Sequence, residues 1–146
     1  MAEISEVRQE LYNTLKTWAD AQSPALSIFV RGQEKEPANN ETFLQFNMLT
    51  AKPEGPFVGT GYRGKENGVF QVTVIGPEQR KLKALEMLAS DIGFAFWPAS
   101  QRTAPTIGTD PVVRITKVHV YDHPSPDDGT LASICDIYWH SYFARA

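Results

Sequence analysis

The sequence is short of the features that mark secreted, membrane-spanning and metal-binding proteins. It holds one cysteine, Cys135, in 146 residues, so it cannot form an internal disulfide, and one thiol cannot build a zinc site alone. Ile134 and Ile137 lie beside Cys135, which predicts a small buried hydrophobic side chain. No apolar run approaches the roughly 18–20 residues that span a bilayer. The segment MAEISEVRQE is acidic and polar where a secretory signal needs a basic start and an apolar block. We therefore expect a protein made in the cytoplasm that does not contact a membrane.

An excess of basic charge is missing as well. Lys and Arg number 14 against 17 Asp and Glu, which gives a net charge of −3. A dedicated nucleic-acid binder carries a basic patch or stripe, and no cluster of lysines and arginines interleaved with aromatic residues occurs here. Apolar residues make up 42% of the chain and charged residues 21%. This composition is typical of a folded protein with a real core, and the length predicts a single domain over residues 1–146.

The strongest pattern is a strand followed by a long helix between Gly68 and Pro98. Residues 69–75 alternate between apolar and polar, the period of a half-buried strand. Pro77 is expected just inside the first turn of the helix. Apolar residues then recur at three- and four-residue spacing and form one helical stripe: Leu82, Leu85, Leu88, Ala89, Ile92 and Phe96.

The rest of the chain supplies one more helix, at residues 3–20, and further strands. Residues 57–63 are expected to form a hairpin with 69–75 through the turn Asn67-Gly68. A slip in the apolar phase predicts a β-bulge near Thr116-Lys117. The other predicted strands span residues 26–30, 42–49, 112–121 and 130–143, with a long loop at 99–111. The resulting order, α-β-β-β-β-α-β-β, predicts an α+β two-layer domain in which two helices pack on a mostly antiparallel sheet.

The last predicted strand has one apolar face and one unusual face. Tyr138, His140 and Tyr142 share the second face with Ile134 and Asp136. Tyrosine and histidine join an apolar body to a polar tip, which suits contact with another chain. The alternative is that these side chains pack under the first helix or a loop of the same chain.

No group of residues forms a recognisable catalytic, cofactor or metal site. Glycines 59, 61, 64 and 68 match a phosphate-binding pattern, but a hairpin is expected there and not the required helix. A second cluster surrounds the turn between the last two predicted strands: His119, Asp122, His123, Asp127 and Asp128. Such residues can bind a divalent metal, but two prolines stiffen the turn and a solvated turn is the preferred interpretation. The spacing along the strand places no serine or cysteine where His140 could act on it as a base. We therefore predict no catalytic residue, no cofactor and no metal.

The chain resembles the tail terminator (tail-completion) proteins of long-tailed bacteriophages. The likeness covers nearly the whole sequence. It begins with the helix that carries Ile4, Val7, Leu11 and Leu15, followed by a polar loop and the strand TFLQFNML. The glycine-rich segment that leads into GVFQVTVIGP, the helix KLKALEMLASDIGFAF and the last pair of strands complete it.

The resemblance implies a structural virion protein and no enzyme. Proteins of this family look like small subunits that form a six-membered ring, cap the tail tube and join it to the head-side connector. The implied partners are further copies of the chain, the tail tube protein and the head–tail connector protein, with DNA passing through the lumen without specific binding. The implied location is the head-proximal end of the tail.

A ring needs a head-to-tail interface in which two different patches of each subunit meet. We predict that Tyr138, His140 and Tyr142 contribute one patch and the loop after Trp97, with Arg102 and Thr103, the other. Two alternatives stay open: another head–tail joining or neck ring protein, and a small metal- or ligand-binding enzyme domain that uses the His/Asp turn.

Overall fold

A computed structural model describes seven stretches of the chain: residues 4–22, 25–29, 42–50, 63–77, 82–108, 112–122 and 130–144. Two helices and six strands lie within them. The helices are α1 (Ile4–Asp20) and α2 (Leu82–Phe96). The strands are β1 (Ser27–Phe29), β2 (Phe43–Thr50), β3 (Arg63–Pro77), β4 (Thr106–Ile107), β5 (Val113–Asp122) and β6 (Thr130–Ala144).

The six strands form one sheet in the order β1-β2-β3-β6-β5-β4. All neighbouring pairs are antiparallel except β1 and β2, which are parallel. The long strands β3 and β6 pair along their whole length at the centre of the sheet, from Arg63 opposite Ala144 to Pro77 opposite Thr130. The predicted α+β class and the mostly antiparallel sheet are confirmed.

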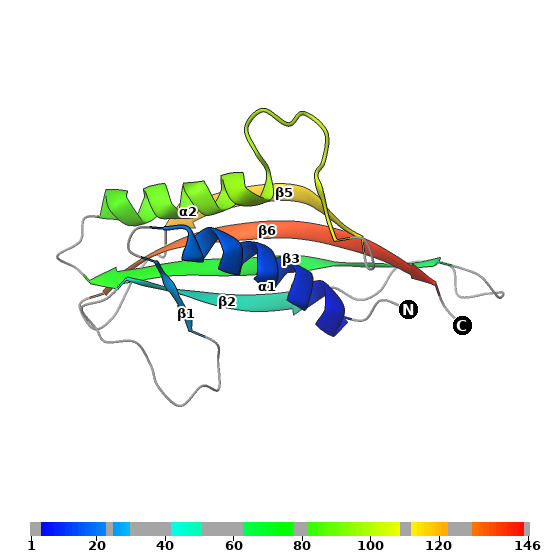
Figure 1. Cartoon of the computed structure of the whole chain (residues 1–146), viewed down its shortest axis with the longest axis horizontal. Helices are drawn as coiled ribbons and strands as arrows, with labels where there is room; N and C mark the ends of the chain where they lie inside the picture. The colour runs from blue at the N-terminus through cyan, green and yellow to red at the C-terminus, as the bar shows by residue number, and fades with distance from the viewer. Residues whose placement is uncertain are drawn as a thin grey trace.

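Both helices lie on the same face of the sheet (Figure 1). The core between the two layers contains a chain of aromatic rings that links four elements. The ring centroids of Tyr12 in α1 and Phe46 in β2 are 5.4 Å apart, those of Phe46 and Phe70 in β3 are 5.3 Å apart, and those of Phe70 and Phe96 in α2 are 6.0 Å apart. Tilted contacts at such distances are favourable for aromatic pairs. The core thus joins each helix to the central strands.

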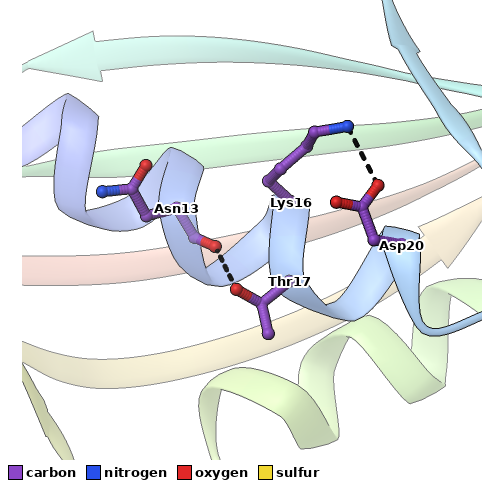
Figure 2. Close-up of polar contacts among 4 residues, drawn as sticks. All are labelled: Asn13, Lys16, Thr17 and Asp20. Carbon is purple, nitrogen blue, oxygen red and sulfur yellow. Dashed lines mark hydrogen bonds and ion pairs between the residues drawn. The ribbon is translucent and has the colours of Figure 1, made fainter.

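The first helix is amphipathic, as its spacing predicts. Val7, Leu11, Leu15 and Ala19 recur every four residues and are buried against the sheet. Its solvent side is held by local contacts (Figure 2): Lys16 Nζ lies 2.9 Å from Asp20 Oδ1, and the Thr17 hydroxyl donates to the Asn13 carbonyl at 2.9 Å. An exposed i,i+4 ion pair of this kind contributes little to stability. The buried stripe, rather than the ion pair, therefore fixes α1 in place.

The second helix packs on β5 and β6 through an unusually close contact. The stripe of Leu85, Ala89, Ile92 and Phe96 is buried. A Cβ at Gly93 would lie 3.0 Å from a methyl of Val118, so the glycine allows the helix to approach the strand closely. Neither helix in the described part of the chain is long and apolar enough to cross a membrane.

The hairpin predicted at Asn67-Gly68 does not form. β3 continues through both residues without a break, and Gly68 pairs with Thr50 on one side and Trp139 on the other. A Cβ at Gly68 would collide with the Leu49 carbonyl oxygen and would lie 3.0 Å from the Trp139 ring. Gly68 is therefore needed because no side chain fits at this position, and not because the chain turns here. The predicted partner strand, residues 57–63, lies outside the described residues except for Arg63, which begins β3.

Two further boundaries differ from the prediction. Pro77 ends β3 opposite Thr130 instead of entering the first turn of a helix, and α2 is described from Leu82. The predicted loop at 99–111 contains the short strand β4, which pairs with Arg114 and Val113. The predicted β-bulge is confirmed, because the register of β5 against β6 shifts between Ile115 and Lys117.

Candidate subunit interface on the uncovered sheet face

The two faces of the sheet are built from alternate residues of the same strands. On β6, Cys135, Ile137 and Trp139 point into the core under the helices, as predicted. The residues between them lie on the opposite face. Within the described residues no helix packs on this second face, which we call the uncovered face; it carries Gln71 of β3, Lys117, His119 and Tyr121 of β5, and Ile134, Asp136, Tyr138 and His140 of β6. The alternative that these side chains pack under the first helix is therefore wrong, and packing under a loop of the same chain stays an open alternative.

A small polar network spans three strands of the uncovered face. Asp136 is the register partner of both Gln71 and His119. The Gln71 side-chain amide donates a hydrogen bond to the Tyr121 hydroxyl at 3.1 Å. Burial raises the pKa of Tyr121, and hydrogen bonding with the Asp136 carboxyl raises it further. The tyrosine is thus a neutral bridge between the two strands that flank β6.

Asp136 is the least satisfied member of this network. It is only 7% exposed, and its Oδ1 atom has no hydrogen-bond partner in the described part of the chain. A buried polar atom without a partner costs free energy. The fold therefore keeps a carboxylate on this face that it does not itself fully satisfy.

Aromatic and cationic side chains gather around the network. The His119 ring stacks on the Tyr121 ring with centroids 5.3 Å apart and an interplanar angle of 27°. Lys117 Nζ lies 5.5 Å from the centre of the Tyr138 ring, within the range of a cation–π contact. Tyrosine is one of the residues enriched at protein–protein interfaces, and two tyrosines, Tyr121 and Tyr138, lie in this patch.

The predicted interface residues occupy two separate places. Tyr138 and His140 are half-buried on the uncovered face, and Tyr142 continues β6 opposite Lys65. Arg102 and Thr103 are exposed in the loop between α2 and β4, which projects away from the sheet in Figure 1. The structure does not bring the two groups together. A role of these residues in a subunit interface stays a prediction.

The projecting loop is tied down at both ends. The Trp97 indole N–H donates to the Gln101 carbonyl at 2.8 Å, and the Gln101 amide donates to the Pro98 carbonyl at 2.9 Å. At the far end the Ile115 amide donates to the Pro105 carbonyl at 2.9 Å. Arg102 and Thr103 are therefore presented on an anchored segment.

The cysteine and histidines show no arrangement for nucleophilic chemistry in the described residues. Cys135 is buried, as predicted, and burial with the nearby Asp136 charge raises its pKa to about 12. A thiol with such a pKa stays protonated at neutral pH and is unreactive. The described residues contain no group of three or more His, Cys, Asp and Glu side chains that could hold a metal. His123, Asp127 and Asp128 lie outside them.

Comparison with known proteins places the chain in a family. Residues 6–139 match a family model described as phage tail terminator protein. A search of curated proteins gives no match. One solved structure aligns over 100% of both chains with a TM-score of 0.74 and 20% identity, which shows the shared fold alone. The match covers most of the sequence and shows that the chain is a structural protein of the phage tail. More particularly, the chain belongs to the phage tail terminator family and is a component of the virion tail.

Sequence reasoning missed how the uncovered face is assembled. The alternation along β3 placed Gln71 on its polar side, and the phase of β5 after the bulge puts Lys117, His119 and Tyr121 on one face. What could not be read from these patterns is that β6 lies between β3 and β5. Only that strand order brings Gln71, Tyr121 and Asp136 together.

Proposed function

We propose that this protein forms a ring, of six subunits by the family resemblance, that caps the end of the tail tube, stops its polymerisation and joins it to the head-side connector. The observation that carries the proposal is the family match over residues 6–139. The protein then acts by binding and not by catalysis. Its partners are further copies of itself, the tail tube protein and the head–tail connector protein, at the head-proximal end of a tail assembled in the host cytoplasm.

The two predicted patches support a ring over a closed dimer. A cyclic ring joins two different surfaces of each subunit, whereas a two-fold dimer joins one surface to itself. The uncovered face with Tyr138 and His140 and the loop with Arg102 and Thr103 are different in chemistry and separate in space (Figure 1). One copy can therefore present its loop to the uncovered face of the next.

The net charge is consistent with a lumen that DNA crosses without being held. Binding to the DNA backbone depends on lysine and arginine contacts with phosphates. The chain carries 14 basic residues against 17 acidic ones, for a net charge of −3. A ring of such subunits has no general excess of positive charge to retain DNA.

Native mass spectrometry over a concentration range, with negative-stain imaging of the same sample, tests the ring. We expect a closed ring with an open centre, either alone or after addition of purified tail tubes. A protein that stays monomeric alone and does not bind tube ends would overturn the proposal.

A double variant tests the uncovered face. Tyr138→Ala with Tyr142→Ala is expected to weaken ring assembly while the melting temperature changes little, because no helix in the described residues packs on that face. Arg8→Ala with Lys83→Ala, on exposed positions of the helical layer, is the matched control and is expected to assemble normally. Unchanged assembly and stability of the tyrosine variant would show that this face is not the interface.

A further inference from the structure

The outer edge of β5 is only partly closed. β4 pairs with Val113 and Arg114 alone, and the Pro105 carbonyl accepts the amide of Ile115. Beyond Ile115, no strand among the described residues pairs with this edge as far as Asp122. An unpaired edge presents a row of backbone donors and acceptors to which another strand can bind.

The register shows which backbone groups face this open edge. Because the Ile115 amide points outward to Pro105, Ile115 and its partner Trp139 form a pair without mutual hydrogen bonds. In an antiparallel ladder such pairs alternate with hydrogen-bonded ones. Ile137 and Cys135 lie two and four residues before Trp139, so their partners Val118 and Val120 also direct their N–H and C=O groups outward.

An apolar groove runs beside these two valines. It has a volume of about 410 Å³ and lies between α2, the start of the projecting loop and β5. Val118 and Val120 of β5 line it together with Phe94 of α2 and Trp97 of the loop. Phe94 is 54% exposed, a large apolar side chain left in solvent. The groove and the open edge meet at Val118 and Val120, which supply both side chain and backbone.

The charge of the edge indicates what fits it. Over its whole length, Val113–Asp122, β5 carries two basic residues, Arg114 and Lys117, together with His119, and one carboxylate, Asp122, at its end. The chain as a whole has a net charge of −3. A second copy of this acidic chain is therefore electrostatically complementary to the basic edge strand. The opposite edge of the described sheet, β1, also lacks a strand partner on its outer side within the described residues.

We propose that the open edge of β5 from Val118 to Val120 pairs with a strand of a second copy of this chain, which also fills the groove beside Phe94. The backbone groups of the two valines hydrogen-bond that strand, and its apolar side chains cover Phe94 and Trp97. Joining the β5 side of one copy to the β1 side of the next is a head-to-tail contact, so it continues around a ring. This inference rests on the proposed ring and adds a strand-to-strand contact between neighbouring subunits to the one proposed above.

Substitution of Phe94 tests the groove. Phe94→Ser is expected to weaken assembly about tenfold or more, since it removes apolar area from the interface, and to leave the fold intact because the side chain is exposed. Met87→Ser is the matched control: Met87 is 59% exposed on the same helix, two turns earlier, and does not line the groove. Equal weakening by both variants would assign the contact to the outer side of α2 and overturn the proposal.

Backbone substitution tests the edge. Val120→Pro removes the outward amide without removing a bond to β6, and Val120→Ala shortens the side chain but keeps the amide. We expect Val120→Pro to assemble far more weakly than Val120→Ala. Hydrogen exchange of the wild-type amides gives the same test without a variant: those of Val118 and Val120 exchange fast in the monomer and become protected in the assembly.

The outcomes separate this inference from the ring itself. Wild-type rings that form with both amides unprotected overturn the edge pairing and leave the ring standing. Protection of the amides on tail tubes without self-association assigns the edge to a different protein and overturns the second copy as occupant. A wild type that neither self-associates nor binds tube ends overturns both proposals.

Discussion

The two faces of β6 show how one strand serves two purposes. On the covered face Cys135, Ile137 and Trp139 are buried among the side chains of both helices. On the uncovered face Asp136 and Tyr138 lie among polar, aromatic and cationic neighbours from β3 and β5. Both faces hold buried polar atoms with no hydrogen-bond partner in the described residues: Ser133 Oγ and Trp139 Nε1 on the covered face and Asp136 Oδ1 on the uncovered face. The apolar burial that stabilises the fold is therefore concentrated on one face of β6, and the charged and aromatic side chains available for contacts are on the other.

The largest expected effect tests the covered face. Phe70 is fully buried at the centre of the aromatic chain, and Phe70→Ala is expected to lower the free energy of unfolding by about 3–5 kcal/mol through lost burial and a cavity. Urea unfolding measures it. Gln71→Ala, at the next residue on the uncovered face, removes one hydrogen bond and is expected to cost about 1 kcal/mol. Equal losses would contradict the division between the faces.

The next effect appears only in alkaline solution. Burial raises the pKa of Cys135 from 9.0 to about 12, so the unfolded thiol ionises at a pH where the folded thiol does not. Stability is thus full below pH 9 and falls by up to about 1.4 kcal/mol per pH unit towards pH 12. Urea titrations at several pH values measure the slope.

Two variants show how much each face contributes to the loss of stability in alkaline solution. Cys135→Ala is expected to flatten it because it removes the ionising thiol under the helices. Tyr121, whose pKa is also raised, lies on the uncovered face, and Tyr121→Phe is expected to flatten the slope less and only above the tyrosine's ordinary value of 10.0. A slope that survives Cys135→Ala unchanged would show that the thiol titrates normally in the folded protein.

The smallest effect concerns the unsatisfied carboxylate. Asp136→Asn removes a buried charge and is expected to raise the free energy of unfolding at pH 7 by about 0.5–1 kcal/mol. Asp122→Asn, at an exposed position of β5, is the control and is expected to change nothing. A loss of stability in Asp136→Asn would mean that the carboxylate is already satisfied within the chain.

Much of the fold follows from local patterns. The four-residue spacing from Val7 to Ala19 predicts α1, the stripe from Leu85 to Phe96 predicts α2, and the phase slip at Thr116 predicts the bulge in β5. Each pattern reflects which side of one element must be buried, so it is written in neighbouring residues. The errors occur where a residue serves a distant part of the chain. Asn67-Gly68 has the composition of a turn, but Gly68 is a glycine because Leu49 and Trp139 leave no room for a Cβ.

The candidate site shows the same limit. The alternation along β6 predicts that Tyr138, His140 and Tyr142 share a face, and the breakers after Trp97 predict the loop that presents Arg102 and Thr103. The network of Gln71, Tyr121 and Asp136 and the open edge at Val118 and Val120 have no local signature. Both depend on which strands are neighbours and on where β4 stops.

Local sequence patterns are sufficient to predict the helices, the alternating faces of the strands, the buried cysteine and the resemblance to tail terminators. These follow from periodicity and composition, which act over a few residues at a time. Two features follow only from the folded structure: β6 lies between β3 and β5, and β5 keeps an open edge beside an apolar groove. The order of the strands brings together residues that are 50 positions apart, as in the hydrogen bond from Gln71 to Tyr121. This order is selected by burial of the whole apolar face of the sheet, and no preference of neighbouring residues encodes it.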